Sequence, residues 1–100
     1  MGDWTFFTNH AHVLVCIARD PDARIRDLAA SVGITERAAQ RIVADLVTSG
    51  YLERRREGRR NRYRVLADQP LRHPVEQPHS VGEVLDLLTG DVRPRRRPRG

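Results

Sequence analysis

The residues with the clearest chemical capacity in this chain are arginines gathered in one segment. Residues 51–66, YLERRREGRRNRYRVL, contain seven arginines and two glutamates. A guanidinium group pairs bidentately with a phosphate or with a guanine edge, whereas a lysine ammonium group lacks that planar geometry. The chemistry that this segment favours is therefore the binding of a polyanion.

The positive charge is confined to this segment and to the last ten residues. Residues 1–50 contain five arginines and six acids, and residues 67–90 contain one arginine and four acids. Residues 91–100 contain five arginines and one aspartate, and the whole chain carries a net charge of +5. A basic patch on an otherwise balanced domain is typical of nucleic-acid binding.

Length and composition favour one small domain. One hundred residues build only a small core, for which oligomerisation is a usual source of added stability. The longest apolar tract, residues 13–18, is far shorter than a membrane span, and no positively charged start precedes it as in a secretory signal. The single cysteine, Cys16, agrees with a reducing compartment. We therefore expect a cytoplasmic domain without membrane contact.

Apolar residues at three- and four-residue spacing predict two helices in the first third of the chain. Thr8 can cap the first helix, which runs to about Arg19, and Pro21 ends it because proline has no amide donor. Gly33 follows the second, shorter helix at a tight turn. The residues expected to be buried are Ala11, Val13, Leu14, Cys16, Ile17 and Ala18 on the first helix and Ile25, Leu28, Ala29 and Val32 on the second.

The third predicted helix spans residues 35–49 and carries a polar face. Thr35 can cap it, and Gly50 ends it by tolerating a left-handed backbone. A rotation of about 100° per residue places the apolar residues on one side: Ala39, Ile42, Val43 and Leu46. The opposite side carries Arg37, Gln40 and Arg41 with the small residues Ala44 and Thr48. Nothing bulky on that side would keep the helix out of a groove about 12 Å wide.

The basic segment at residues 51–66 predicts a β-hairpin. Glu57-Gly58 supplies turn chemistry between two strands. On the return strand, apolar residues alternate with arginines from Arg62 to Val65. We therefore expect a hairpin with one face packed and the other cationic.

Three further segments follow the hairpin. Residues 68–79 contain three prolines and two histidines and are expected to form an extended linker. Residues 80–90 open with the capping-box pair Ser80 and Glu83, and their helix is too short to be stable unless it docks on the first helix or on a second subunit. Its apolar stripe is Val81, Val84, Leu85 and Leu88. Residues 91–100 lack apolar periodicity and are expected to be disordered.

In this order, the predicted helices, the glycine turn and the Arg-rich hairpin resemble the winged helix-turn-helix domain of bacterial transcription regulators of the MarR and ArsR types. The resemblance spans residues 8–66, and the motif IRDLAASVGITERAAQRIVADLVTSGYLERR carries most of it. It implies a mainly α fold with a small β-hairpin (α+β), in which a three-helix core is followed by a wing and a short C-terminal helix. The DNA-binding domain would then be residues 1–67.

The resemblance also implies which residues contact DNA. In the major groove, the third helix would face the bases with Thr35, Glu36, Arg37, Gln40 and Arg41. The wing and the start of the second helix would contact phosphates or an adjacent minor groove through Arg24, Arg26, Arg56, Arg59, Arg60 and Arg62. The function implied is that of a sequence-specific transcription regulator that binds double-stranded DNA.

A homodimer on an inverted repeat would form through the first helix and residues 80–89. MarR-type proteins are usually longer than this chain, and their long flanking helices build both the dimer and a ligand pocket. Because only the segment at residues 80–89 takes that place here, we expect no small-molecule effector.

Two alternative functions stay open. A metal-responsive repressor would use His10 and His12 near Cys16, with His73 and His79 approaching from the linker. Their spacing is not that of a recognised zinc site, so we predict neither a metal nor another cofactor. A winged-helix module can instead bind RNA or a protein partner.

We do not expect an enzyme. The chain has no phosphate-binding loop, nucleophile elbow or paired carboxylates. A core of this size is also expected to be too small for a substrate cavity of a few hundred cubic ångströms.

Overall fold

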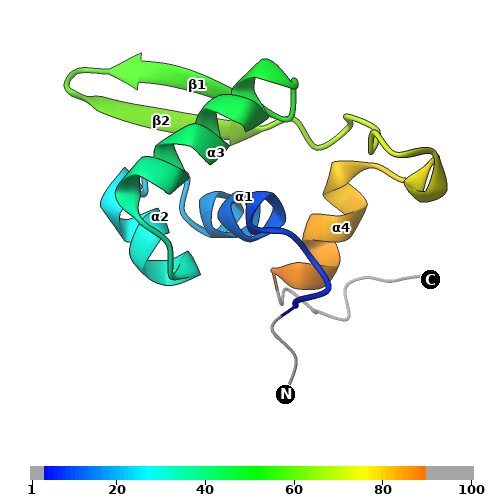
Figure 1. The fold of residues 1–100 in the computed structure, drawn as a ribbon. Coiled ribbons are helices and arrows are strands. Elements are labelled where there is room, and N and C mark those ends of the chain that lie inside the picture. Colours follow the sequence, from blue (N-terminus) through cyan, green and yellow to red (C-terminus); the bar gives the residue numbers. More distant parts are fainter. Residues whose placement is uncertain (1–3, 90–100) are drawn as a thin grey trace.

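The computed structural model describes residues 4–89 and shows four α-helices and one hairpin in that part of the chain. In chain order these are α1 (Asn9–Arg19), α2 (Ile25–Val32), α3 (Glu36–Thr48), β1 (Leu52–Glu57), β2 (Arg60–Val65), the short 3-10 helix η1 (Pro74–Glu76) and α4 (Val81–Leu88). The predicted fold class, mainly α with a small β-hairpin, is confirmed (Figure 1). No helix in this part is long and apolar enough to cross a membrane.

Polar caps and glycines set the bounds of the first three helices. The Thr8 hydroxyl oxygen accepts a hydrogen bond of 3.3 Å from the backbone N–H three residues later, and the Thr35 hydroxyl oxygen accepts one of 3.0 Å in the same way. Both bonds satisfy donors that the first turn of a helix leaves without partners. Gly33 and Gly50 follow α2 and α3 with a φ of +85°, which a residue with a Cβ atom avoids.

The helix α1 lies at the centre of the core. It packs against α2, α3, β2 and α4, and it is therefore covered on more sides than one apolar stripe predicts. Val13 and Ile17 have no exposed surface, and Val15, outside the predicted stripe, is buried as well. Ala11 and Ala18 are only half-buried. The other elements complete the core with Leu28, Ala29, Ala39, Ile42, Val43, Leu46, Tyr51, Leu52, Tyr63, Val81 and Leu85.

The hairpin at residues 52–65, which we call the wing, is an antiparallel pair of strands. Its register ends with Glu57 opposite Arg60, so Gly58 and Arg59 form the connection. Gly58 has a φ of +66°, and the turn thus lies one residue later than the predicted pair Glu57-Gly58. The tip of the wing projects from the body on the side of α2 and of the N-terminal end of α3 (Figure 1).

Residues 66–80 form a closed loop, and the prediction of an extended linker over residues 68–79 is wrong. The arms of the loop and the start of α4 are joined by backbone hydrogen bonds of 2.9–3.0 Å, from Leu71 N–H to His79 O, from Val81 N–H to Gln69 O and from Gly82 N–H to Ala67 O. The prolines lack amide donors, but their neighbours supply enough of them to close the loop. The Tyr51 hydroxyl also donates to the Pro70 carbonyl at 3.2 Å, which ties the loop to the start of the wing.

The helix α4 docks on α1 of its own chain, one of the two sites predicted for it. The capping box is confirmed: Ser80 Oγ accepts from the Glu83 N–H at 3.3 Å, and Glu83 Oε1 accepts from the Ser80 N–H at 2.8 Å. Arg19 Nη2 donates to the Leu88 carbonyl at 3.0 Å and so joins the two helices. The predicted disordered tail, residues 91–100, lies outside the described residues.

Candidate nucleic-acid interface

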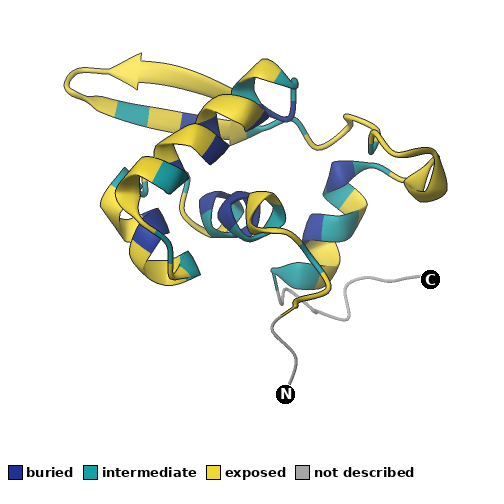
Figure 2. Cartoon of the chain, viewed as in Figure 1, coloured by how far each residue is buried: buried dark blue, intermediate teal, exposed yellow. Residues whose placement is uncertain are grey.

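The helix α3 presents a polar face to solvent. Its buried side consists of Ala39, Ile42, Val43 and Leu46. All residues predicted to face the bases are exposed and lie at the start of the helix: Thr35, Glu36, Arg37, Gln40 and Arg41. Ala44 and Thr48 continue the exposed face toward the end of the helix, which Figure 2 shows in yellow. Its exposed side chains are polar or small, which is what entry into a groove about 12 Å wide requires.

The charged groups of this face are not used inside the described part of the chain. Between residues 4 and 89, none of the ion pairs includes Glu36, Arg37 or Arg41. Thr35 differs because its hydroxyl oxygen already accepts the capping bond. The guanidinium groups of α3 are therefore hydrated and are available to a partner.

The wing does not divide into one packed and one cationic face as predicted. Side chains alternate across a strand, so one face carries Leu52, Arg54 and Arg56 opposite Val65, Tyr63 and Asn61. The other face carries Glu53, Arg55 and Glu57 opposite Arg64, Arg62 and Arg60. The first face is buried only at its base, and arginines lie on both faces toward the tip. The outer half of the wing is thus cationic all round.

The predicted contacts leave out three exposed arginines of the wing, Arg54, Arg55 and Arg64. Arg64 Nε pairs with Glu53 Oε1 at 3.0 Å, whereas Arg54 and Arg55 form no ion pair within the described residues. The signal was present, because consecutive arginines on a strand must place cations on both faces. Of the arginines predicted at the tip, Arg56 donates through Nε to the Gly58 carbonyl at 3.2 Å, and Arg59 is exposed in the connection.

Arg60 and Arg62 lie against the body of the protein. Arg60 Nη2 donates to the backbone carbonyl of Asp22 at 2.7 Å, and Arg62 Nε lies 3.7 Å from the Asp22 carboxylate oxygen Oδ1. Asp22 belongs to the turn between α1 and α2, far from the wing in sequence. Two of the predicted phosphate contacts are therefore already in contact with a residue of this chain.

The start of α2 lies beside the wing. Arg24 precedes α2, with its backbone N–H donating to Asp27 Oδ2 at 3.4 Å, and Arg26 is exposed on the first turn. A hollow of about 350 Å³ between this turn and the wing is lined by Arg24, Arg59 and Arg60, among other residues. The structure thus brings together cations that the sequence separates by more than thirty residues.

A second surface lies on the opposite side of the molecule, where α1, α4 and the loop at residues 66–80 meet. It contains a groove of about 620 Å³, lined largely by apolar side chains that include Phe7, Leu14, Leu46, Leu71 and Leu85. Small-molecule sites have volumes of about 300–1,000 Å³. The loop at residues 66–80 folds back and supplies one wall of this open groove.

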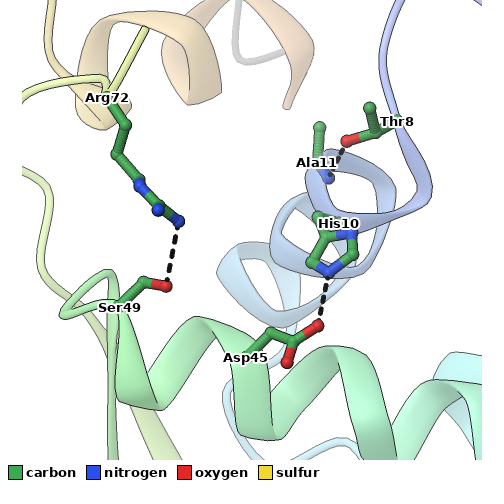
Figure 3. Close-up of polar contacts among 6 residues, drawn as sticks. All are labelled: Thr8, His10, Ala11, Asp45, Ser49 and Arg72. Carbon is green, nitrogen blue, oxygen red and sulfur yellow. Dashed lines mark hydrogen bonds and ion pairs between the residues drawn. The ribbon is translucent and has the colours of Figure 1, made fainter.

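Polar contacts at the edge of this groove connect it to the end of α3 (Figure 3). His10 Nε2 of α1 lies 2.9 Å from Asp45 Oδ2 of α3. Arg72 of the loop donates through Nη1 to Ser49 Oγ at 3.3 Å. The first contact reaches α3 at Asp45, one turn after Arg41, and the second reaches Ser49, which follows the last residue of α3.

The residues of the metal-responsive alternative are not brought together. His10 contacts Asp45, His73 Nδ1 accepts a bond from the N–H of Val75, and His79 contacts Glu83. Within the described residues, no group of three or more histidine, cysteine, aspartate or glutamate side chains is placed to hold a metal ion.

Comparison with known proteins gives one result that bears on this geometry. The sequence model of the MarR family matches residues 8–62, more than half of the chain. The match extends from the cap of α1 to the return strand of the wing, and it therefore covers α3 and most of the basic segment. A search of curated proteins finds no match. The ArsR-type resemblance and a bacterial source stay predictions.

Proposed function

This chain belongs to the MarR family and is a winged-helix DNA-binding transcription regulator, and we propose that it selects specific sites in duplex DNA with α3 in the major groove. The observation that carries this proposal is the exposed face of Arg37, Gln40 and Arg41. Arginine suits a bidentate bond to guanine, and glutamine suits adenine. Thr35 and Glu36 at the start of α3 are the two further base-facing positions that we propose.

We propose that the wing and the start of α2 bind the DNA backbone on either side of α3. Arg24, Arg26, Arg56 and Arg59 are exposed, and the tip of the wing and α2 lie on the side of the N-terminal end of α3 (Figure 1). Arginines at such positions neutralise phosphates or enter a narrow minor groove. Contacts of this kind supply affinity and orientation, whereas α3 supplies the choice of sequence.

We also propose a homodimer through α1 and residues 80–89, which would bind an inverted repeat. Val81 and Leu85 are buried within the chain, so the contact between copies rests on Leu87, whose side chain is 77 % exposed, with Val84 and Leu88 beside it. Sedimentation is expected to show a dimer at micromolar concentration and a monomer for Leu87→Arg. If the protein without this substitution sediments as a monomer, this dimer is ruled out.

The base-reading role is tested by replacing Arg37 or Arg41 with alanine. Each change is expected to cost about 1–3 kcal/mol on the selected site and to relax the preference at one base pair. Titration of a selected duplex and a random duplex, both at one salt concentration, measures this. An equal loss on both duplexes would contradict the base-reading role.

Selection of bound duplexes from a random pool would provide the matched site. We expect two half-sites about 10–10.5 base pairs apart, because that spacing places two recognition helices on one side of the duplex. Equal binding to single-stranded RNA or to an acidic protein would instead favour the alternative function as an RNA-binding or protein-binding module.

A further inference from the structure

We infer that Arg60 and Arg62 are positioning residues that hold the wing against Asp22, and that the phosphate contacts of the wing come from its exposed arginines that form no ion pair within the described residues, Arg55 and Arg59 among them. The assignment of phosphate contacts rests on the proposed DNA-binding function. The contacts with Asp22 do not, because they lie within this chain. The wing then has two groups of arginines, one that positions the wing and one that contacts phosphates.

Three contacts join the return strand of the wing to the turn before α2. The Tyr63 N–H donates to the Pro21 carbonyl at 3.1 Å, as a further strand would accept it. Arg60 donates to the Asp22 carbonyl at 2.7 Å, and Arg62 lies 3.7 Å from its carboxylate. Contacts from three residues of one strand therefore meet a single turn.

The turn that receives these contacts is held in place. Asp20 Oδ1 accepts from the Asp22 N–H at 3.1 Å, and the Asp20 carbonyl accepts from the Ala23 N–H at 3.0 Å. Pro21 between them has a fixed φ. Because the turn is constrained by its own bonds, a side chain that binds it acquires a defined position relative to α2.

The wing needs such support. A two-stranded hairpin is at best marginally stable in water, and the outer half of this one is exposed on both faces. Arg55 also stands directly opposite Arg62, and like charges at opposed positions repel. The Asp22 carboxylate offsets that repulsion from the Arg62 side, which leaves Arg55 directed to solvent.

The anchor also shapes the hollow beside α2. Asp22, Arg24, Arg59 and Arg60 all line it. Arg59 follows Gly58 in the connection and is the neighbour of Arg60, so the contact of Arg60 with Asp22 restricts where Arg59 can lie at the edge of the hollow. The anchor would therefore set the separation of two proposed phosphate contacts without touching DNA itself.

Salt dependence separates the two groups of arginines. Arg55→Gln and Arg59→Gln should each lower the slope of log affinity against log salt by about 0.9, the value for one lost phosphate contact. Arg60→Gln and Arg62→Gln should each lower this slope by less than half as much. They should lower the affinity about two- to fivefold at every salt concentration, the range measured for exposed ion pairs. A slope lowered as much by Arg60→Gln or Arg62→Gln as by Arg59→Gln would overturn the inference.

For Asp22→Asn, the expected change in DNA affinity is opposite in sign to the change that net charge alone predicts. Removal of an acid beside a DNA surface should raise affinity, and Glu57→Gln, with the same charge change at the wing tip, is expected to do so. Asp22→Asn should instead lower affinity about two- to fivefold, and it should have no such effect when Arg62→Gln is already present. A rise equal to that of Glu57→Gln, or full additivity with Arg62→Gln, would overturn the inference.

Hydrogen exchange of the Tyr63 amide tests the anchor without DNA. Its exchange should become about two- to fivefold faster in Asp22→Asn, Arg60→Gln and Arg62→Gln and stay unchanged in Arg59→Gln. Unchanged exchange in all four variants would remove the anchor even if DNA binding is intact. Faster exchange in a protein that binds no duplex would support the anchor and contradict the proposed function.

Discussion

The side of the molecule formed by α3 and the wing uses arginine differently from the side formed by α1, α4 and the loop at residues 66–80. On the first side, Arg37, Arg41 and Arg55 point to solvent and form no ion pair within the described residues. On the second side, Arg19 binds the Leu88 carbonyl and Arg72 binds the Ser49 hydroxyl. The two arginines on the second side thus join elements, whereas on the first side Arg60 and Arg62 join elements and the three arginines named above are left open toward a partner.

The two sides also differ in what holds them together. The loop side is closed by backbone bonds and by the packing of α4, and its groove has an apolar lining. The wing has buried side chains only at its base, at Leu52 and Tyr63. Changes on the loop side should therefore alter stability, and changes on the α3 side should alter DNA binding.

The largest expected effect is on the loop side. Leu85 is 6 % exposed, and Leu85→Ala should lower the free energy of unfolding by about 2–5 kcal/mol because it leaves a cavity between α4 and α1. Urea unfolding measures this. Val75→Ala, at a position 84 % exposed, is the control and should stay within about 0.5 kcal/mol; a comparable loss there would contradict the difference in packing.

A pair of helix caps provides the most direct comparison. Thr35→Ala and Ser80→Ala each remove a hydroxyl that accepts a backbone bond, at 3.0 Å and 3.3 Å, and each should cost about 1 kcal/mol of stability. Only Thr35→Ala should also weaken binding to the selected duplex, since Thr35 lies on the proposed base-reading face. Equal effects of both variants on DNA affinity, measured well below the unfolding midpoint, would remove the separation between the two sides.

The contact between His10 and Asp45 links the two sides, and a smaller effect is expected there. Both side chains are about half exposed, at 47 % and 52 %. A double-mutant cycle with His10→Ala and Asp45→Asn should give a coupling of about 0.2–1 kcal/mol in unfolding. A coupling well above that range would mean that the orientation of α3 depends on the groove side more strongly than this geometry implies.

The smallest effect concerns Glu83 at the start of α4. The hydrogen bond from the Ser80 N–H, and then that from His79, holds the pKa of Glu83 below its ordinary value of 4.5. Because the folded state lowers this pKa, the stabilisation is present above about pH 4.5 and is lost as the pH falls through the lower value. Unfolding midpoints measured from pH 6 to pH 3 should fall slightly more than those of Glu83→Gln. Parallel curves would contradict a depressed pKa.

Much of the fold could be predicted because its signals are local. Thr8, Thr35 and Ser80 satisfy donors within their own first turns, and Gly33 and Gly50 allow a left-handed backbone at the next position. The outward face of α3 follows from helical rotation alone. These interactions span at most four residues, so their outcome depends little on the rest of the chain.

Other features depended on residues that are distant in sequence. The closed loop at residues 66–80 forms because its two arms bond to each other, which proline content does not reveal. The groove exists only where that loop meets α1 and α4. Strand register, in turn, decides that Arg55 stands opposite Arg62.

The sequence by itself determined the helix bounds, the outward face of α3 and the concentration of arginine in the wing, because short-range hydrogen bonds and residue periodicity fix all three. Only the tertiary structure decided which arginines remain open to a partner. Arg60 donates to the backbone carbonyl of Asp22 across thirty-eight positions of sequence, and Arg59, next to it, is exposed in the connection between the strands. Neighbours of the same type differ in role because the fold supplies an acceptor to one and solvent to the other.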